Sequence, residues 1–279
     1  MNIKDDLFSF NKDFSNYLLK IFNNNNFTNL KFLEAISYSV LAESKKIRPF
    51  IIFYLGSLLK IKKDTLFSVG LAIEMIHTYT LVHDDLPSMD NDNYRRGQLS
   101  SHKKYNEATA ILVGDALLSD AFFYLSKQDL DISDKVKIKI INKVSNYIGS
   151  NNLILGQFLD INFKKSDSIN NIEEILKINL YKTAKLFSLC AIIPAIISGL
   201  SENKINKCAL WGEAVGFIFQ MIDDIKDKED GKPNIFNILG EKDFYELLNE
   251  KILLCKNIAN DLGLESLNQI LNLITNKGE

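Results

Sequence analysis

Residues 71–97 read LAIEMIHTYTLVHDDLPSMDNDNYRRG, an apolar run that passes directly into four aspartates and then two arginines. Apolar residues before the aspartates recur every three or four positions from Leu66 to Ile76, and further apolar residues fill the other side. A helix that is apolar on most faces belongs in the interior of a protein. We therefore predict a buried helix over residues 64–86, which ends near the aspartates because Pro87 disfavours continuation.

Helical periodicity extends along most of the chain, and the sequence lacks the long alternating runs typical of β-strands. The polar breaks between helical segments are too short to be linkers between domains. The sequence predicts one all-α domain over residues 1–279, in which about ten helices pack mostly antiparallel to their neighbours. The predicted helices lie at residues 3–22, 28–42, 49–60, 64–86, 107–127, 134–163, 172–199, 202–228, 241–262 and 264–276.

Composition excludes several classes of partner. The 279 residues carry a formal net charge of −2, so nothing global indicates binding to nucleic acid or to a membrane surface. The three cysteines form no CxxC pair, which is typical of a reducing cytosol. The polar N-terminus does not resemble a signal peptide, and the longest apolar run, residues 189–200, is too short to span a bilayer. We expect a soluble, cytoplasmic protein with no membrane span and no nucleic-acid partner.

Arginine is rare in this chain, which makes its positions informative. Of the 33 basic residues only three are arginines, namely Arg48, Arg95 and Arg96. Because lysine serves at most surface sites, these arginines are expected where a planar guanidinium fork is needed, usually to bind carboxylate or phosphate. The alternative is that they were retained by chance, which is less plausible for an adjacent pair beside an acidic cluster.

A second acidic cluster follows another apolar helical run, FIFQMIDDIKDKEDG at residues 217–231. Asp223 and Asp227 are four residues apart on one helix face, where like charges destabilise a helix unless a cation lies between them. The first cluster has the spacing D-D-x4-D. The carboxylates of the two clusters belong to Asp84, Asp85, Asp90, Asp223, Asp224 and Asp227.

Clusters with only oxygen ligands suit a hard cation such as Mg²⁺, which takes one or two protein carboxylates and fills its other positions with water and substrate phosphates. Each cluster lies at the end of an apolar helix. If those helices pack side by side, the two sets of carboxylates face each other across one cavity. The sequence then predicts several Mg²⁺ ions that hold a polyphosphate, whereas either cluster alone is equally compatible with a solvated helix end.

Basic residues gather in the segment ESKKIRPF at residues 43–50, beside a predicted helix start. A helix N-terminus with basic side chains favours phosphate, although an ordinary basic turn has the same composition. Two separate diphosphates are therefore expected, one bound through metals and one through basic residues directly. The candidate basic residues are Lys45, Lys46, Arg48, His77, Arg95, Arg96, Lys182 and Lys232.

The histidines allow a different interpretation. His77 lies seven residues before Asp84, about 10 Å away along the same helix face, where a single histidine is usually a core residue. His83 and Asp84 form an HD pair, which is also found in helical metal phosphohydrolases. That alternative needs further histidine ligands, and it leaves the second acidic cluster and the arginine pair unexplained.

These segments together resemble the trans-isoprenyl diphosphate synthases, and most closely the bacterial farnesyl diphosphate synthases. The resemblance extends in order over nearly the whole chain. It is carried by KKIRP (45–49), IHTYTLVHDDLPSMDNDNYRRG (76–97), SHKKYNEATAILVGDALL (101–118), GQFLDI (156–161), YKTAKLF (181–187) and FIFQMIDDIKD (217–227). It implies the isoprenoid synthase fold, a helical bundle around a central cavity, and a homodimer.

The resemblance also implies a role for each residue. Mg²⁺ would chelate an allylic diphosphate through Asp84, Asp85, Asp90, Asp223, Asp224 and Asp227. Arg95 and Lys182 would contact that same diphosphate. The diphosphate of isopentenyl diphosphate would lie against Lys45, Arg48, His77 and Arg96, and Lys232 resembles a further phosphate-binding lysine. Gln157, Thr183 and Gln220 would face the allylic carbon as positive charge develops there.

The expected reaction condenses isopentenyl diphosphate with dimethylallyl or geranyl diphosphate to farnesyl diphosphate (C15), with release of pyrophosphate. Tyr79 lies five residues before Asp84, about 7.5 Å deeper along the helix, where its ring would form the floor of the product tunnel with Thr80 beside it. The alternatives are geranyl or geranylgeranyl diphosphate synthesis, a terpene cyclase, or a non-catalytic prenyltransferase subunit.

The chain departs from the family pattern at three places. Glu43 and Ser44 replace the usual Gly-Gly, and Asn91 stands where aspartate is common. The segment between Asp227 and Gly231 is short, so the resemblance implies that a loop with another phosphate-binding lysine is deleted here. We expect this loss to reduce the turnover rate more than it reduces the affinity for the substrates.

Overall fold

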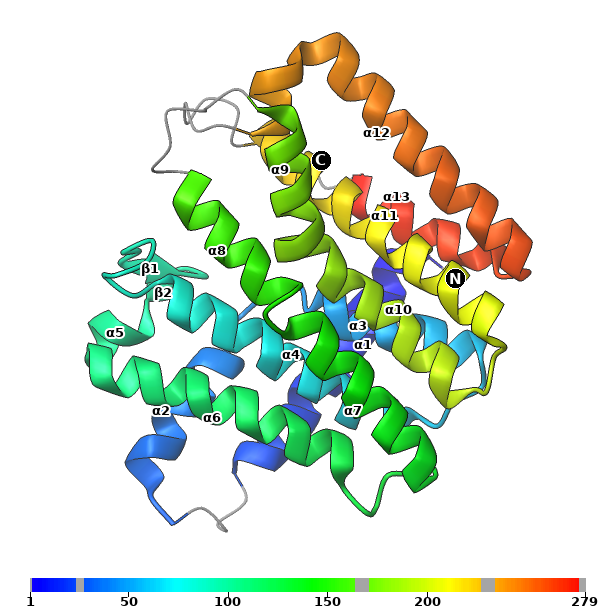
Figure 1. The fold of residues 1–279 in the computed structure, drawn as a ribbon. Helices are drawn as coiled ribbons and strands as arrows, with labels where there is room; N and C mark the ends of the chain where they lie inside the picture. Colours follow the sequence, from blue (N-terminus) through cyan, green and yellow to red (C-terminus); the bar gives the residue numbers. More distant parts are fainter. Residues whose placement is uncertain (1, 24–27, 164–170, 227–233, 276–279) are drawn as a thin grey trace. The chain divides into compact units, whose positions relative to one another are not determined.

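The computed structural model describes residues 2–23, 28–163, 171–226 and 234–275. Most of these residues are helical, so the all-α prediction is confirmed (Figure 1). The chain forms two compact units. Unit 1 comprises Met1–Tyr54 and Lys62–Ser133, and unit 2 comprises Leu55–Ile61 and Asp134–Glu279. The single domain over residues 1–279 and its central cavity stay predictions, and each unit is described by itself.

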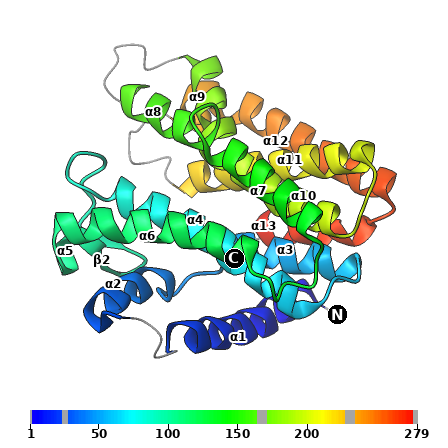
Figure 2. The same cartoon turned by 60° about the horizontal axis from the view of Figure 1, so that its bottom comes forward.

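Unit 1 is built around one buried helix, α4, which lies side by side with α6 and also contacts α1 and α2 (Figures 1 and 2). Its elements are α1 (Ile3–Phe22), α2 (Leu30–Val40), the first part of α3 (Ile47–Leu58), α4 (Lys63–Asp84), β1 (Tyr94–Arg95), β2 (Gln98–Leu99), α5 (Ser101–Lys104) and α6 (Glu107–Ser126).

Helix α4 confirms the helix predicted over residues 64–86. Leu66, Val69 and Ile73 are at most 1% exposed, and the helix ends at Asp84 as its apolar run ends. Burying each such side chain contributes about 1.5–3 kcal/mol. An aromatic cluster fixes α1 against α4, because Phe14 meets Phe67 edge to face at 5.4 Å between ring centroids.

The polar stretch after α4 contains a β-hairpin that the sequence did not predict. Tyr94 pairs with Leu99 and Arg95 pairs with Gln98. Both turn residues have positive φ, 54° at Arg96 and 77° at Gly97, as a two-residue type I′ turn requires. The strands are only two residues long, and arginine instead of asparagine precedes the glycine, so no ordinary hairpin pattern was visible.

Unit 2 contains the remaining helices. One prediction here was wrong, because residues 134–163 form two helices, interrupted where the side chain of Asn152 donates to the carbonyl of Asn146 at 3.1 Å. The elements are the end of α3, α7 (Asp134–Ile148), α8 (Leu153–Phe163), α9 (Ile172–Asn179), the π-helical turn η1 (Leu180–Ala184), α10 (Lys185–Ile197), α11 (Glu202–Lys226), α12 (Ile235–Leu262), the 3₁₀ turn η2 (Glu265–Leu267) and α13 (Asn268–Thr275).

The core of unit 2 lies where α10 and α11 run side by side (Figures 1 and 2). Two glycines of α11 allow its close approach to η1 and α10. A Cβ added at Gly216 would lie 2.6 Å from the Cα of Ala184, and one at Gly212 would lie 2.7 Å from the carbonyl oxygen of Phe187. Trp211 beside them is fully buried. Helix α12 begins earlier than predicted and is kinked at Gly240, where φ is 73°.

In the part of the chain that the structure describes, three helical stretches are long and apolar enough to cross a membrane, by length and composition alone: Lys63–Asp84, Glu107–Ser126 and Ile172–Ile197. Within the apolar 18-residue part of each stretch, 83%, 39% and 67% of the residues, respectively, are buried inside the protein. Burial in the core accounts for the apolar character of α4. Helix α6 is different, because it leaves Ile111, Leu112 and Phe123 exposed. The absence of a membrane span stays a prediction.

Candidate active site

The acidic cluster of unit 1 lies at the C-terminal end of α4. Asp84 ends the helix, Asp85 is its C-cap residue, and both side chains are buried. The backbone N–H of Asp90 donates to the carbonyl oxygen of Asp84 at 2.9 Å. The loop therefore places the third aspartate of D-D-x4-D next to the first. Asn91 has a φ of 54°, a left-handed conformation that asparagine tolerates better than most residues. The departure at Asn91 therefore suits the local backbone.

Asp85 and Arg95 form a close ion pair. Nε and Nη2 of Arg95 donate to Oδ1 of Asp85 at 2.9 and 2.5 Å, and Nη2 also donates to Asp92 at 2.8 Å. Burial raises the pKa of the Asp85 carboxyl, and the bonds from Arg95 oppose that rise. Since both donors use the same carboxylate oxygen, Asp85 fixes the guanidinium of Arg95 beside the acidic cluster.

Basic residues of unit 1 contact α4 two to three turns before its acidic end, at Glu74 and His77. Nη1 of Arg48, from the first turn of α3, lies 3.1 Å from Nε2 of His77. Burial lowers the pKa of His77 well below its usual value, and the charge of Arg48 lowers it further. The neutral imidazole therefore accepts a hydrogen bond from Arg48 at Nε2, which leaves the ring proton on Nδ1.

Lys45 and Lys46 have different surroundings although they are neighbours. Lys45 is exposed, whereas Lys46 is 6% exposed and donates to the carboxylate of Glu74 at 2.9 Å. Arg96 reaches the same oxygen of Glu74 at 3.4 Å. Glu74 was missed by sequence reasoning, although a carboxylate within the apolar run at residues 71–82 was a visible signal.

The candidate product-length residues lie on α4 before the acidic cluster. Tyr79 is 6% exposed, and its ring meets that of His83 edge to face at 5.9 Å. Burial, and secondarily the charge of Asp84, raises the pKa of Tyr79 to about 12. Its hydroxyl oxygen has no hydrogen-bond partner among the described residues. Thr80 donates to the backbone carbonyl of His77 at 2.8 Å, so its hydroxyl is used within the helix.

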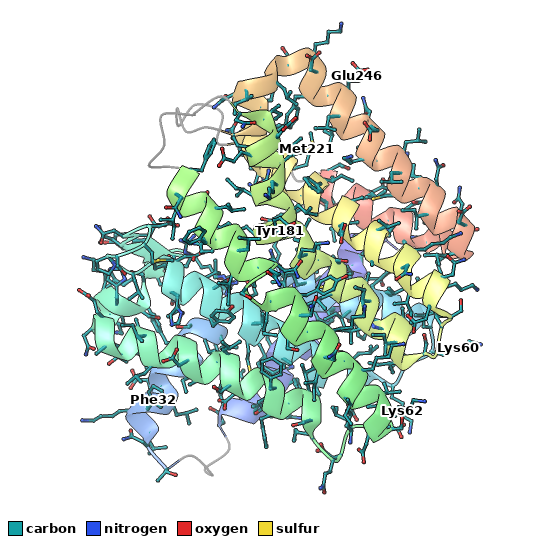
Figure 3. The ribbon with its side chains drawn as sticks, in the orientation of Figure 1. Phe32, Lys60, Lys62, Tyr181, Met221 and Glu246 are labelled. Carbon is teal, nitrogen blue, oxygen red and sulfur yellow. The ribbon has the colours of Figure 1, made fainter. Side chains whose placement is uncertain are left out.

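In unit 2, the π-helical turn η1 carries Lys182 and Thr183, beside the Tyr181 labelled in Figure 3. Nζ of Lys182 lies 2.7 Å from Oδ2 of Asp160 on α8. Asp160 belongs to the GQFLDI segment, but the sequence did not predict it as a partner of Lys182. A Cβ added at Gly156 would lie 2.3 Å from the backbone nitrogen of Lys182. The absence of a side chain there lets α8 contact η1 directly.

A chain of hydrogen bonds connects η1 with the second acidic cluster. The hydroxyl of Thr183 donates to Oε1 of Gln220 at 3.2 Å, and Nε2 of Gln220 donates to Oδ1 of Asp224 at 3.0 Å. Oδ2 of Asp224 accepts from the backbone N–H of Ile235 at 3.0 Å. Asp224 therefore joins α11 to the start of α12.

The remaining candidates of unit 2 divide into described and undescribed residues. Asp223 is partly exposed and lies 3.3 Å from Lys226, one turn along the helix. Nε2 of Gln157 is buried with no hydrogen-bond partner in the part of the chain that the structure describes. Asp227, Lys232 and the shortened segment between them lie outside the described residues. That the two acidic clusters share a cavity stays a prediction.

The carboxylates that the structure describes can supply part of the ligand set of Mg²⁺. Within residues 2–23, 28–163, 171–226 and 234–275, no three histidine, cysteine, aspartate or glutamate side chains lie close enough to hold a metal ion. Mg²⁺ commonly uses only one or two protein carboxylates and takes its other ligands from phosphate and water. Asp84 and Asp90 in unit 1, and Asp223 in unit 2, are compatible with that requirement.

Comparison with known proteins gives this helical fold a class and then a family. An FPP/GFPP synthase from Zymomonas mobilis superposes with a TM-score of 0.91 at 26% identity, over 98% of both chains. The fold is therefore that of the isoprenoid synthases. Residues 30–240 match the model of the polyprenyl synthetase family. The chain belongs to the polyprenyl synthetase family.

Relatives within the family differ in the product that their names state. The farnesyl diphosphate synthase of Micrococcus luteus is 41% identical over 241 residues, which cover 86% of this chain and 78% of that protein. The large subunit 1 of a heterodimeric geranylgeranyl pyrophosphate synthase from Arabidopsis thaliana is 36% identical over 244 residues, 80% and 66% of the two chains. Family membership therefore leaves the product length open.

Proposed function

We propose that the protein is a Mg²⁺-dependent prenyltransferase that condenses isopentenyl diphosphate with dimethylallyl or geranyl diphosphate to farnesyl diphosphate, releasing pyrophosphate. The observation that carries the proposal is the separate fixation of two adjacent arginines, Arg95 on Asp85 and Arg96 on Glu74. Adjacent guanidinium groups held by different carboxylates suit two different diphosphates.

The allylic diphosphate would be bound through Asp84, Asp90 and Asp223, which would hold Mg²⁺, and through Arg95 and Lys182 directly. When bound, Mg²⁺ neutralises the negative charge of a departing pyrophosphate. Asp85 and Asp224, which were also predicted as metal ligands, are engaged with Arg95 and with Gln220 and Ile235. We assign these two carboxylates mainly to positioning.

The isopentenyl diphosphate would be bound by Arg48, His77 and Arg96, with the exposed Lys45 at the edge of the site. A neutral His77 can accept from Arg48 while its Nδ1–H stays available as a donor. This arrangement orients one guanidinium without adding another positive charge, so binding depends on the two arginines.

Positive charge on the allylic carbon would be stabilised by oxygen atoms of unit 2. The hydroxyl hydrogen of Thr183 is used in its bond to Gln220, so the lone pairs of that oxygen can face developing positive charge. Gln157 supplies a further amide in the same unit. Such an ion must be kept from water until it reacts with the isopentenyl double bond.

A C15 product is favoured by the position of Tyr79, whose buried ring precedes Asp84 on α4. Geranylgeranyl diphosphate synthesis is the alternative, because relatives with that name also match the chain. We further propose that the protein is a homodimer. Support comes from α6, on which Leu112 and Phe123 are 56% and 59% exposed along one helix face.

The proposed reaction is tested by pyrophosphate release. Release should require Mg²⁺ and both substrates together, and Asp84→Asn should reduce its rate by about 100-fold or more. Asp243→Asn, an exposed position on α12, is the matched control and should leave the rate unchanged. Inorganic phosphate released from one substrate alone would indicate a hydrolase, and a cyclic hydrocarbon would indicate a cyclase. The absence of any product would indicate a non-catalytic subunit.

A further inference from the structure

Glu74 is a buried carboxylate that has so far entered the account only as the partner of Arg96. It lies within α4, is 1% exposed, and is surrounded in sequence by apolar residues. Its Oε1 accepts from Nζ of Lys46 at 2.9 Å and from Nη2 of Arg96 at 3.4 Å. A buried carboxylate is costly unless it is paired, so both cations contribute to keeping it there.

Lys46 connects Glu74 to the segment before α3. Its Nζ also donates to the carbonyl oxygens of Val40 at 2.8 Å and Ala42 at 3.3 Å, at the C-terminal end of α2. Its backbone has a φ of 43°, a left-handed conformation that a lysine adopts only when the surrounding structure holds it. Lys46 therefore fixes the start of α3, two residues before Arg48.

Arg96 is held in a comparable way from the other side. Its φ is 54° at the turn of the hairpin, and its side chain is 12% exposed. Nη2 contacts Glu74, whereas Nη1 is buried and has no hydrogen-bond partner in the described part of the chain. A left-handed arginine costs about 1–2 kcal/mol, so the turn alone does not favour this conformation. One edge of the guanidinium is anchored and the other is left for a ligand.

Glu74 and His77 are three residues apart, so they lie on one face of α4 in consecutive turns. Glu74 contacts Arg96, and His77 contacts Arg48. One helix face thus holds both arginines that the proposed function assigns to isopentenyl diphosphate. We propose that Glu74 is a positioning residue for isopentenyl diphosphate, which acts by fixing the guanidinium of Arg96 and, through Lys46, the segment that carries Arg48. This inference rests on the proposed function.

A purely structural role is the competing explanation, in which Glu74 only neutralises the buried Lys46. The two explanations differ in what Glu74→Gln changes. A positioning role predicts that KM for isopentenyl diphosphate rises about 10- to 100-fold, as expected for loss of a charge-assisted hydrogen bond. KM for the allylic substrate and kcat should change less than about threefold. A structural role predicts that the KM values for both substrates change by similar factors.

A double-mutant cycle with Arg96→Gln gives the sharper test. If Glu74 acts mainly through Arg96, then Glu74→Gln should add little to the KM increase already caused by Arg96→Gln. Glu74→Asp should restore part of the wild-type KM. Glu202→Gln, which removes the same charge from the exposed pair with Lys139, is the matched control and should leave both KM values unchanged.

Glu74→Gln leaves Lys46 buried without its counter-charge, which is strongly destabilising in many proteins. If this variant does not fold, Lys46→Met combined with Glu74→Gln removes one charge of each sign. This double variant should fold and should still have the raised KM for isopentenyl diphosphate. A wild-type KM in either folded variant would overturn the proposal, and so would full additivity with Arg96→Gln.

A direct binding measurement separates this inference from the proposed function. Calorimetry with isopentenyl diphosphate alone should show about 10-fold or more weaker binding to the Glu74→Gln variant than to the wild type. Equal affinities would overturn the role of Glu74 even in an active enzyme. If the wild-type protein binds isopentenyl diphosphate but forms no elongated product, the proposed function is overturned. The role of Glu74 is then still decided by comparing the affinities of the wild type and the Glu74→Gln variant.

Discussion

The two adjacent aspartates at the end of α4 both hold neighbouring residues in place, Asp85 through its side chain and Asp84 through its backbone carbonyl. Asp85 accepts two hydrogen bonds from Arg95, and Asp84 receives the N–H of Asp90 on its backbone carbonyl. In unit 2, Asp224 joins α11 to α12 beside the more exposed Asp223. In each cluster one carboxylate, Asp85 or Asp224, fixes neighbouring parts of the protein through its hydrogen bonds.

The rarity of arginine proved to be a useful signal at the residue scale. Arg95 contacts Asp85 with two nitrogen atoms, which a lysine cannot do, and Arg96 and Arg48 contact Glu74 and His77. Their carboxylate and imidazole partners could not be predicted, since these contacts join positions far apart in the sequence. Lys46 shows the same limit, because a buried lysine and an exposed one are adjacent and look alike in sequence.

Replacing Tyr79 tests the product-length assignment. Tyr79→Ala removes a buried ring, so most of the product should become C20 or longer. Tyr79→Phe keeps the ring and should keep C15 as the main product. Both products can be sized by reversed-phase chromatography. A Tyr79→Ala enzyme that still stops at C15 would contradict the role of this ring as the tunnel floor.

His77 should make stability depend on pH. Its folded-state pKa lies below the usual value of 6.5, so the unfolded chain binds a proton that the folded imidazole does not. Its contribution is complete above pH 6.5 and decreases as pH falls below that value, by up to about 1.4 kcal/mol per pH unit. Denaturant titrations between pH 8 and pH 5 should show a smaller pH dependence for His77→Gln. Identical pH dependence in both proteins would refute this account.

At the scale of elements, the close approach of α8 and η1 is a requirement for the position of Lys182. Gly156→Ala would place a Cβ 2.3 Å from the backbone nitrogen of Lys182, so α8 and η1 must separate. We expect about 1–3 kcal/mol of lost stability and at least about 10-fold lower kcat.

A matched control for this change lies two residues earlier on α8. Ile154 is 50% exposed, so Ile154→Ala should change stability by less than about 0.5 kcal/mol and leave kcat unchanged. Thermal unfolding and steady-state kinetics of both variants check the comparison. Wild-type kcat in Gly156→Ala would show that the contact between α8 and η1 does not position Lys182.

The long helices were predictable because their apolar residues follow the helical period, as in α1, α4 and α6. The break between α7 and α8 was missed because a short polar turn leaves the flanking apolar period nearly intact. The π-helical turn η1 was missed because its apolar pattern does not differ from that of an ordinary helix, and its close contact with Gly156 of α8 joins positions far apart in the sequence. The hairpin was missed because its strands are too short to show alternation.

At the scale of the whole molecule, the exposed apolar face of α6 should form the contact between two subunits. The wild-type protein should be a dimer by light scattering after size-exclusion chromatography. Leu112→Asp would bury an unpaired carboxylate in that contact and should raise the dissociation constant at least about 10-fold. Phe8→Asp, at a residue on α1 that is 76% exposed, should leave the dimer intact. A monomeric wild-type protein would contradict this assignment.

The account depends most directly on what the purified protein makes. Isotope-labelled isopentenyl diphosphate should be incubated with geranyl diphosphate and Mg²⁺, and the products sized by mass spectrometry. We predict farnesyl diphosphate as the main product, formed together with one pyrophosphate per condensation, and no product when a chelator removes Mg²⁺. Turnover should be slow, because the segment after Asp227 is short. A protein that elongates neither geranyl nor dimethylallyl diphosphate under these conditions would contradict the account.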